Sequence, residues 1–205
     1  MKRVKEDTHI YHDPSRHYTV DEYYALTDTD RGELINGLLY DMAPPTRIHQ
    51  GLVGELYAEI RNYIRKKQGD CHVYPAPFGV LLDEDEKTVL EPDISVICDP
   101  GKLNEKGCVG APDWVIEVVS PTDPAHDYIY KLKKYFTSGV REYWIVDPGS
   151  QTIAVYHLEK FRAQSLPDSG IIALPVAEEY TMADTIKAGI YDDLEIDFRE
   201  ISKFL

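Results

Sequence analysis

The segment from Pro112 to Ser120, PDWVIEVVS, constrains the fold more than any other part of the sequence. In a β-strand its side chains would alternate between the two faces of a sheet. From Trp114 to Val119 both faces would then be apolar, apart from one carboxylate, that of Glu117. A strand that is apolar on both faces lies inside a sheet that is covered on both sides. The sequence therefore predicts a layered protein in which helices cover a central sheet.

Helix and strand patterns around this segment supply the other layers. Apolar residues recur every three or four positions from Ile48 to Lys67, which predicts a helix that stops at Gly69. A second amphipathic helix is predicted over 126–139. Short apolar runs predict strands at 71–74, 78–82, 89–97, 141–147 and 152–158, with weaker ones at 171–174 and 194–198. This order predicts an α+β sandwich, with a central mixed sheet flanked by helices.

A short helix and a hairpin are predicted ahead of this core. Thr19, followed three residues later by Glu22, has the spacing of a capping box and predicts a helix over 19–26. Asn36-Gly37 stands between apolar residues, which is typical of a two-residue hairpin turn. Both elements are therefore expected to form from local signals alone.

The length of 205 residues suits one domain with one core. Residues 1–18 are polar and are expected to form a flexible tail, which leaves 19–205 as a single domain. The sequence has no apolar run long enough to span a bilayer, and its start has no apolar secretory segment. We therefore expect a cytoplasmic protein that does not associate with membranes.

Three cysteines, Cys71, Cys98 and Cys108, bear on the redox state. Their number is odd and no CxxC pair occurs, which argues against a disulfide framework and against a structural zinc site. The sequence thus predicts reduced thiols that are mostly buried.

The formal net charge of −14 argues against a nucleic-acid partner, because phosphate binding favours a basic surface. This charge describes the whole surface and does not fix the local field around a site. A local site for phosphate therefore stays compatible with the composition.

Glu117 is the most informative candidate residue. An unpaired carboxylate buried inside a sheet costs several kcal/mol, so a metal ion, a cation or a raised pKa must compensate for it. A buried salt bridge is the structural alternative, and a metal-binding or catalytic role is the functional one.

Two further residues gain weight beside Glu117. Pro92 can place the carboxylate of Asp93 at a bulge in the strand, although Pro-Asp is also a common turn dipeptide. Lys131 lies in the second predicted helix, where it either pairs with Asp127 on the surface or reaches over the sheet to the two carboxylates. Two carboxylates suit Mg²⁺, which can activate water, and a lysine can stabilise developing negative charge.

The sequence resembles the Uma family of restriction-endonuclease-like proteins, within the PD-(D/E)XK nuclease superfamily. The matching segments are GELINGLLYDMAPPTRIHQ, EPDISVI and APDWVIEVVSPTDPAHDYIYKLKKYFTSGVREYWIVDP. The resemblance implies an αβββαβ core. Asp93 then becomes the motif aspartate, and Glu117 the second acid. Many superfamily members have lysine two residues after that acid, where this chain has Val119, and Lys131 on the following helix takes that role.

The resemblance also gives a possible role to two residues outside the motif. Glu33 matches the family's early glutamate and would be a third acidic contributor. His49 falls on a family motif position and would be a ligand or a base, although a lone histidine is often an ordinary core residue.

The residues alone predict a site where carboxylates hold a metal ion, and the resemblance implies an Mg²⁺- or Mn²⁺-dependent endonuclease that hydrolyses phosphodiester bonds in DNA. Two alternatives stay open: a non-catalytic binding or regulatory protein that keeps the nuclease fold, and a metal-dependent hydrolase of a small phosphorylated substrate. A homodimer is possible, because cutting both strands of a duplex often uses two copies related by a two-fold axis.

Overall fold

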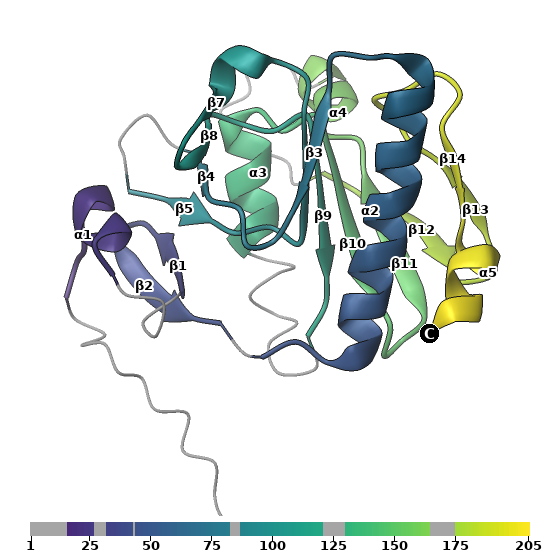
Figure 1. Ribbon diagram of the computed structural model, residues 1–205, viewed down its shortest axis with the longest axis horizontal. Coiled ribbons are helices and arrows are strands. Elements are labelled where there is room, and N and C mark those ends of the chain that lie inside the picture. Colours follow the sequence, from purple (N-terminus) through teal and green to yellow (C-terminus); the bar gives the residue numbers. More distant parts are fainter. Residues whose placement is uncertain (1–15, 27–31, 43, 83–86, 121–129, 165–174) are drawn as a thin grey trace, which may run out of the picture.

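The computed structural model describes residues 16–26, 32–42, 44–82, 87–120, 130–164 and 175–205 (Figure 1). Within these ranges the strands form two six-stranded sheets and one two-stranded sheet. None of the helices in the same ranges is long and apolar enough to cross a membrane.

The first six-stranded sheet contains the covered strand. Its order is β12 (Glu178–Thr181), β11 (Thr152–Tyr156), β10 (Glu142–Asp147), β9 (Trp114–Val118), β6 (Ile94–Ile97) and β3 (His72–Pro75). Every residue of β9 is buried, as the sequence predicts for a central strand. β9 runs parallel to β10 and antiparallel to β6, so the sheet is mixed.

Two helical layers cover this sheet. Figure 1 shows it nearly edge-on, with α2 (Arg47–Lys67) on one side and α3 (Leu132–Ser138) on the other. The apolar face of α2 packs with Trp114 and Ile116, whereas α3 packs with Val115. The elements α2, β3, β6, β9, α3 and β10 follow one another in the predicted αβββαβ order.

The second six-stranded sheet lies beside the first. Its order is β2 (Leu38–Asp41), β1 (Gly32–Ile35), β5 (Val89–Leu90), β4 (Val80–Leu81), β8 (Gly107–Val109) and β7 (Leu103–Asn104). The single strand predicted over 89–97 is therefore wrong. The chain changes sheet at Pro92, because β5 belongs to one sheet and β6 to the other. The sequence did not predict β7 and β8 or the 3₁₀ turn Pro100–Lys102 that precedes them.

Local signals near the N-terminus are confirmed. Thr19 and Glu22 form the reciprocal capping box of α1 (Val20–Tyr24). Asn36 and Gly37 have φ angles of 53° and 82°, which suit the hairpin turn between β1 and β2. The predicted tail ends before Tyr18, because the side chain of Tyr18 is buried and its backbone N–H donates to the carbonyl of Gly37 at 2.7 Å. Residues 1–15 lie outside the described ranges.

The C-terminal third was predicted least well. β14 (Glu195–Asp197) confirms the strand expected at 194–198, whereas the one expected at 171–174 falls outside the described residues. The sequence did not predict β12, β13 (Thr185–Lys187) or α5 (Phe198–Ile201). α4 (Leu158–Gln164) begins where the end of a strand was expected. The 3₁₀ turn Ser202–Phe204 closes the chain.

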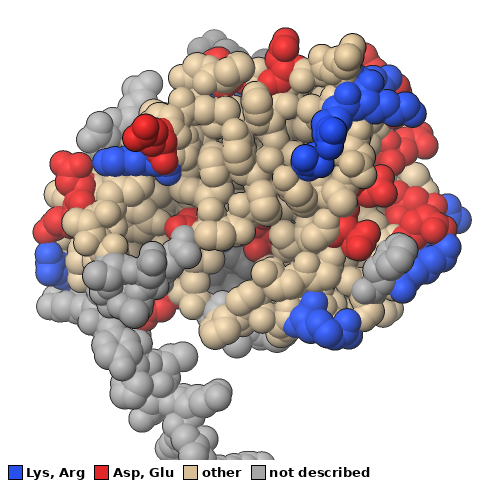
Figure 2. Space-filling model, in the orientation of Figure 1, with Lys and Arg blue, Asp and Glu red and all other residues tan. Residues whose placement is uncertain are grey.

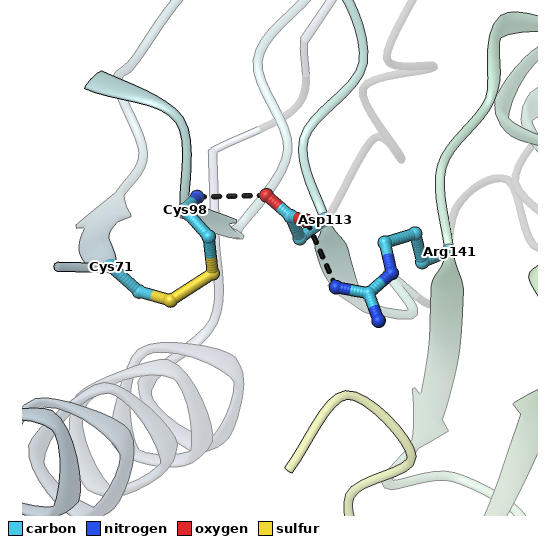
Figure 3. The surroundings of a disulfide bond; sticks show 4 residues. All are labelled: Cys71, Cys98, Asp113 and Arg141. Carbon is cyan, nitrogen blue, oxygen red and sulfur yellow. Dashed lines mark hydrogen bonds and ion pairs between the residues drawn. A yellow bond between two sulfur atoms is a disulfide. The ribbon is translucent and has the colours of Figure 1, made fainter. Parts of the chain in front are cut away.

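A disulfide joins Cys71 to Cys98, and the prediction of reduced thiols is wrong for this pair (Figure 3). Cys71 directly precedes β3 and Cys98 directly follows β6, and these paired strands bring the two residues together. Asp113 accepts the N–H of Cys98 at 2.7 Å and a hydrogen bond from Arg141 at 3.2 Å. Cys108 is a free, buried thiol, as expected.

Candidate active site

Glu117 is buried on β9, on the side of the sheet that packs with α3, and only 4% of its surface is exposed. Its Oε1 lies 3.0 Å from Nζ of Lys131, whose surface is 5% exposed. The same ammonium lies 3.1 Å from Oε1 of Glu33. Lys131 therefore reaches inward and bridges two buried carboxylates. Asp127, its alternative surface partner, lies outside the described residues.

Tyr135 adds a hydrogen bond that the sequence did not predict. Its hydroxyl donates to Glu117 Oε1 at 2.7 Å. Burial, together with the negative charge of Glu117, raises the pKa of Tyr135 well above its ordinary value, so the phenol stays a donor. Tyr135 lies four residues after Lys131, and this helical spacing was the available signal that both face the same carboxylate.

Glu33 reaches the site from β1, a strand of the other sheet. Its Oε1 accepts the backbone N–H of Glu91 at 3.0 Å in addition to the contact with Lys131. Glu91 follows β5 directly, so the pairing of β1 with β5 sets this contact. The early glutamate thus lies in contact with Lys131, a partner that the sequence did not predict for it.

Asp93 lies where the chain passes from one sheet to the other. Its Oδ2 accepts the backbone N–H of Val118 at 2.7 Å and lies 3.2 Å from Nε2 of His49. Ile94 at the start of β6 pairs with Ile116 of β9, so Asp93, directly before β6, lies at the same end of this strand pair as Glu117. The two carboxylates have different partners, since Asp93 contacts α2 through His49, whereas Glu117 contacts Lys131 and Tyr135.

His49 comes from the first turn of α2, where Thr46 caps the helix by accepting the N–H of His49 at 3.2 Å. Burial acts to lower the pKa of His49, but the hydrogen bond and charge of Asp93 outweigh it and leave the pKa raised. The ring of His49 thus holds one oxygen of Asp93 in place.

The donor set can be compared with what metal ions require. Asp93 and Glu117 offer carboxylate oxygens from neighbouring strands, which fits a hard cation such as Mg²⁺ that takes one or two protein carboxylates. A search of the described residues finds no group of three or more His, Cys, Asp or Glu arranged to hold a metal ion. The five residues predicted from the sequence form two adjoining groups, one around Lys131 and one around Asp93.

Comparisons with known proteins bear on the family and the fold of the chain. The Uma2 family, described as "Putative restriction endonuclease", matches residues 20–183. A relative from Synechocystis, named "Uncharacterized protein slr1290", is 26% identical over 154 residues, which cover 72% of this chain and 80% of the relative.

A crystal structure of a "putative nuclease belonging to DUF820" from Anabaena variabilis superimposes with a TM-score of 0.70 at 19% identity. The superposition covers 91% of this chain and 98% of that one. The likeness confirms the predicted restriction-endonuclease-like α+β fold.

Proposed function

This chain belongs to the Uma2 family, and from that premise we propose that it is a divalent-metal-dependent endonuclease that hydrolyses phosphodiester bonds in DNA. One observation carries the proposal. Asp93 directly precedes β6, Glu117 lies near the adjoining end of its partner strand β9, and the buried ammonium of Lys131 contacts Glu117 at 3.0 Å. Two carboxylates beside a cation suit phosphoryl chemistry.

Asp93 and Glu117 would hold Mg²⁺ or Mn²⁺, which, when bound, would lower the pKa of a water molecule and offset charge on the scissile phosphate. The N–H of Val118 and the ring of His49 fix Asp93, and Tyr135 fixes Glu117. Such contacts matter because a metal ligand needs its orientation set by its neighbours.

Lys131 would act on the substrate side of this pair. Water screens the charge of a buried ammonium less than that of an exposed one. The ammonium of Lys131 would stabilise negative charge that develops on the phosphate oxygens. Its contact with Glu33 at 3.1 Å restricts where the ammonium lies. Glu33 is thus a positioning residue for Lys131.

The surface charge favours a second candidate, a metal-dependent hydrolase of a small phosphorylated substrate. The formal net charge is −14. On the face in Figure 2, blue side chains gather over the C-terminal end of α2, which carries Arg65, Lys66 and Lys67. A broad uncharged area separates them from the blue atoms at the left, and red atoms lie between them and the blue atoms at the right. A small substrate would need no extended basic track. A non-catalytic binding protein would fit this surface as well.

A cleavage assay separates these functions. Supercoiled plasmid and a single-stranded oligonucleotide are incubated with Mg²⁺, Mn²⁺ or EDTA, and the products are resolved on gels. We expect cleavage that needs the metal and disappears in Glu117→Gln. Glu178→Gln, which alters an exposed carboxylate on β12, is the matched control and is expected to cleave normally.

Cleavage that persists in Glu117→Gln would overturn the site assignment. No cleavage of either DNA by the wild type, together with release of phosphate from a small phosphodiester, would favour the second candidate. No turnover of any of these substrates would favour the non-catalytic binding protein.

The assembly state is part of the same proposal. A homodimer would present two sites related by a two-fold axis, which suits cutting both strands of a duplex. Sedimentation of the wild type in the presence of DNA measures this. A monomer that only nicks plasmid would exclude the dimer and leave the metal site intact.

A further inference from the structure

A cavity of about 320 Å³ lies on the side of the molecule that carries α1, away from α2 (Figure 1). Four segments far apart in the sequence line it: the end of α1, the stretch before β4, Glu91 after β5, and the turn between β7 and β8. The residues that decide its chemistry are aromatic or charged: Tyr23, Tyr24, Phe78, Glu91, Glu105 and Lys106.

The aromatic rings of this cavity are held in place. Tyr24 packs edge-on against Tyr23 at 5.3 Å, and Nζ of Lys106 lies 4.4 Å from the centre of the Tyr24 ring. Phe78 stacks on Tyr74 with ring centres 4.2 Å apart. Flat ring surfaces that are already ordered suit a planar ligand, which can stack on them without ordering loose side chains.

The polar groups of the cavity select among planar ligands. Glu91 Oε1 accepts the hydroxyl of Tyr23 at 3.2 Å. An ionised carboxylate only accepts hydrogen bonds, so a ligand beside Glu91 must bring N–H or O–H donors. Glu91 and Glu105 together outweigh the single charge of Lys106, which disfavours a phosphate inside the cavity. The preferred ligand is a neutral planar ring with N–H donors.

The cavity adjoins the candidate active site through Glu91. The backbone N–H of Glu91 donates to Glu33, the partner of Lys131, at 3.0 Å. Asp93 follows two residues later, and two residues span at most roughly 7 Å between Cα atoms. A ring in the cavity would therefore lie close to a phosphate at the carboxylate pair.

We propose that this cavity binds one unpaired nucleobase with N–H donors, from the same nucleic acid whose backbone lies at Asp93 and Glu117. Such a base stacks on Tyr24 and Phe78 and donates to Glu91. The inference rests on the proposed nuclease function, for which it names a second contact with the substrate. Enzymes that take a base out of the stack, or that act on single strands, use aromatic surfaces of this kind.

A fluorescence titration tests the inference without cleavage. A strand of thymidines with one 2-aminopurine is titrated with protein in EDTA, and anisotropy reports binding while the 2-aminopurine intensity reports stacking. We expect the wild type to bind and to quench the probe. Tyr24→Leu should weaken binding about tenfold and Phe78→Leu similarly, whereas Tyr24→Phe, which keeps the ring, should bind like the wild type.

Two further variants complete the design. Lys106→Gln changes a side chain that lies over the Tyr24 ring and should weaken binding roughly threefold. Tyr180→Leu is the matched aromatic control and should bind like the wild type, because it lies on β12, an edge strand of the six-stranded sheet that contains β9. Circular dichroism checks that each variant is folded.

Wild-type protein that binds the strand without quenching, or that does not bind it, would overturn the inference. Quenching that is unchanged in Tyr24→Leu and Lys106→Gln would overturn it as well. These outcomes differ from failure of the proposed function, which would appear as missing cleavage in metal while quenching in EDTA persisted.

Discussion

Glu117 and Glu142 lie on neighbouring strands, β9 and β10, but on opposite faces of the six-stranded sheet to which both strands belong. Both are buried, with 4% and 1% of their surfaces exposed. Glu117 faces a cation and a phenol, Lys131 and Tyr135. Glu142 instead accepts neutral N–H groups, from the Trp144 indole at 2.6 Å and the Ile190 backbone at 2.8 Å. The same residue type at similar burial is thus compensated in two different ways.

The two glutamates differ in the kind of group that compensates each buried carboxylate. The partners of Glu117 are side chains that lie beyond the sheet, Lys131 and Tyr135. The backbone that contacts Glu142 belongs to the turn between β13 and β14, where a Cβ added to Gly189 would meet Glu142 Oε2 at 2.8 Å. Glu142 therefore holds the C-terminal hairpin against the sheet.

Lys131→Met should give the largest effect, because it removes the cation that compensates the buried charge of Glu117. It leaves two buried carboxylates without their cation, so we expect a loss of about 3–5 kcal/mol in the free energy of unfolding. Cleavage should fall about 10²–10³-fold. Urea denaturation and the plasmid assay measure both. Lys133→Met, at an exposed position on the same helix, is the control. Equal stability of the two variants would contradict the buried bridge.

Glu142→Gln should change how stability depends on pH. Burial raises the pKa of Glu142 to about 7, although the N–H donors of Trp144 and Ile190 oppose the shift. A carboxyl with a raised pKa contributes stability that is fully present below its unfolded pKa and is lost as pH rises through its folded pKa. Between pH 4.5 and 7 the wild type should therefore lose on the order of 3 kcal/mol relative to Glu142→Gln.

Denaturation of both proteins at several pH values measures this difference. Cleavage should be unchanged in Glu142→Gln at a pH where the variant is folded, because this residue lies on the other face of the sheet. A constant difference in stability across that pH range would contradict the raised pKa of Glu142. A loss of cleavage would show that Glu142 and Glu117 are not separated as described.

Tyr135→Phe should give the smallest of these effects. It removes one hydrogen bond to a charged acceptor, which should lower stability by about 2 kcal/mol. Lys131 still compensates Glu117, so metal binding should persist while cleavage slows. Tyr156→Phe, on β11, is the control. Complete loss of metal binding in Tyr135→Phe would mean that the phenol, and not Lys131, keeps Glu117 in place.

Local patterns were sufficient for part of the fold and of the site. The covered strand, the capping box at Thr19 and the hairpin at Asn36-Gly37 each depend on residues close in sequence, and all three are confirmed. The same kind of reasoning identified Glu117 as a candidate site residue, because it is a carboxylate within an apolar strand.

The remaining features depend on which distant strands pair. The disulfide needs β3 beside β6, and the contact between Glu33 and Lys131 needs β1 beside β5. The change of sheet at Pro92 could not be seen, because a proline inside an apolar run is equally compatible with a bulge. Glu142 was missed because a carboxylate at the start of a strand resembles an exposed strand end.

The most direct test of the account is Mn²⁺ binding, followed by electron paramagnetic resonance of the free ion. The wild type and Glu142→Gln should bind one Mn²⁺ with the same affinity, because Glu142 lies away from Asp93. Glu117→Gln should lose binding at millimolar Mn²⁺, since one of its two carboxylate ligands is gone. Equal binding by wild type and Glu117→Gln, or no binding by either, would contradict a metal site at Asp93 and Glu117.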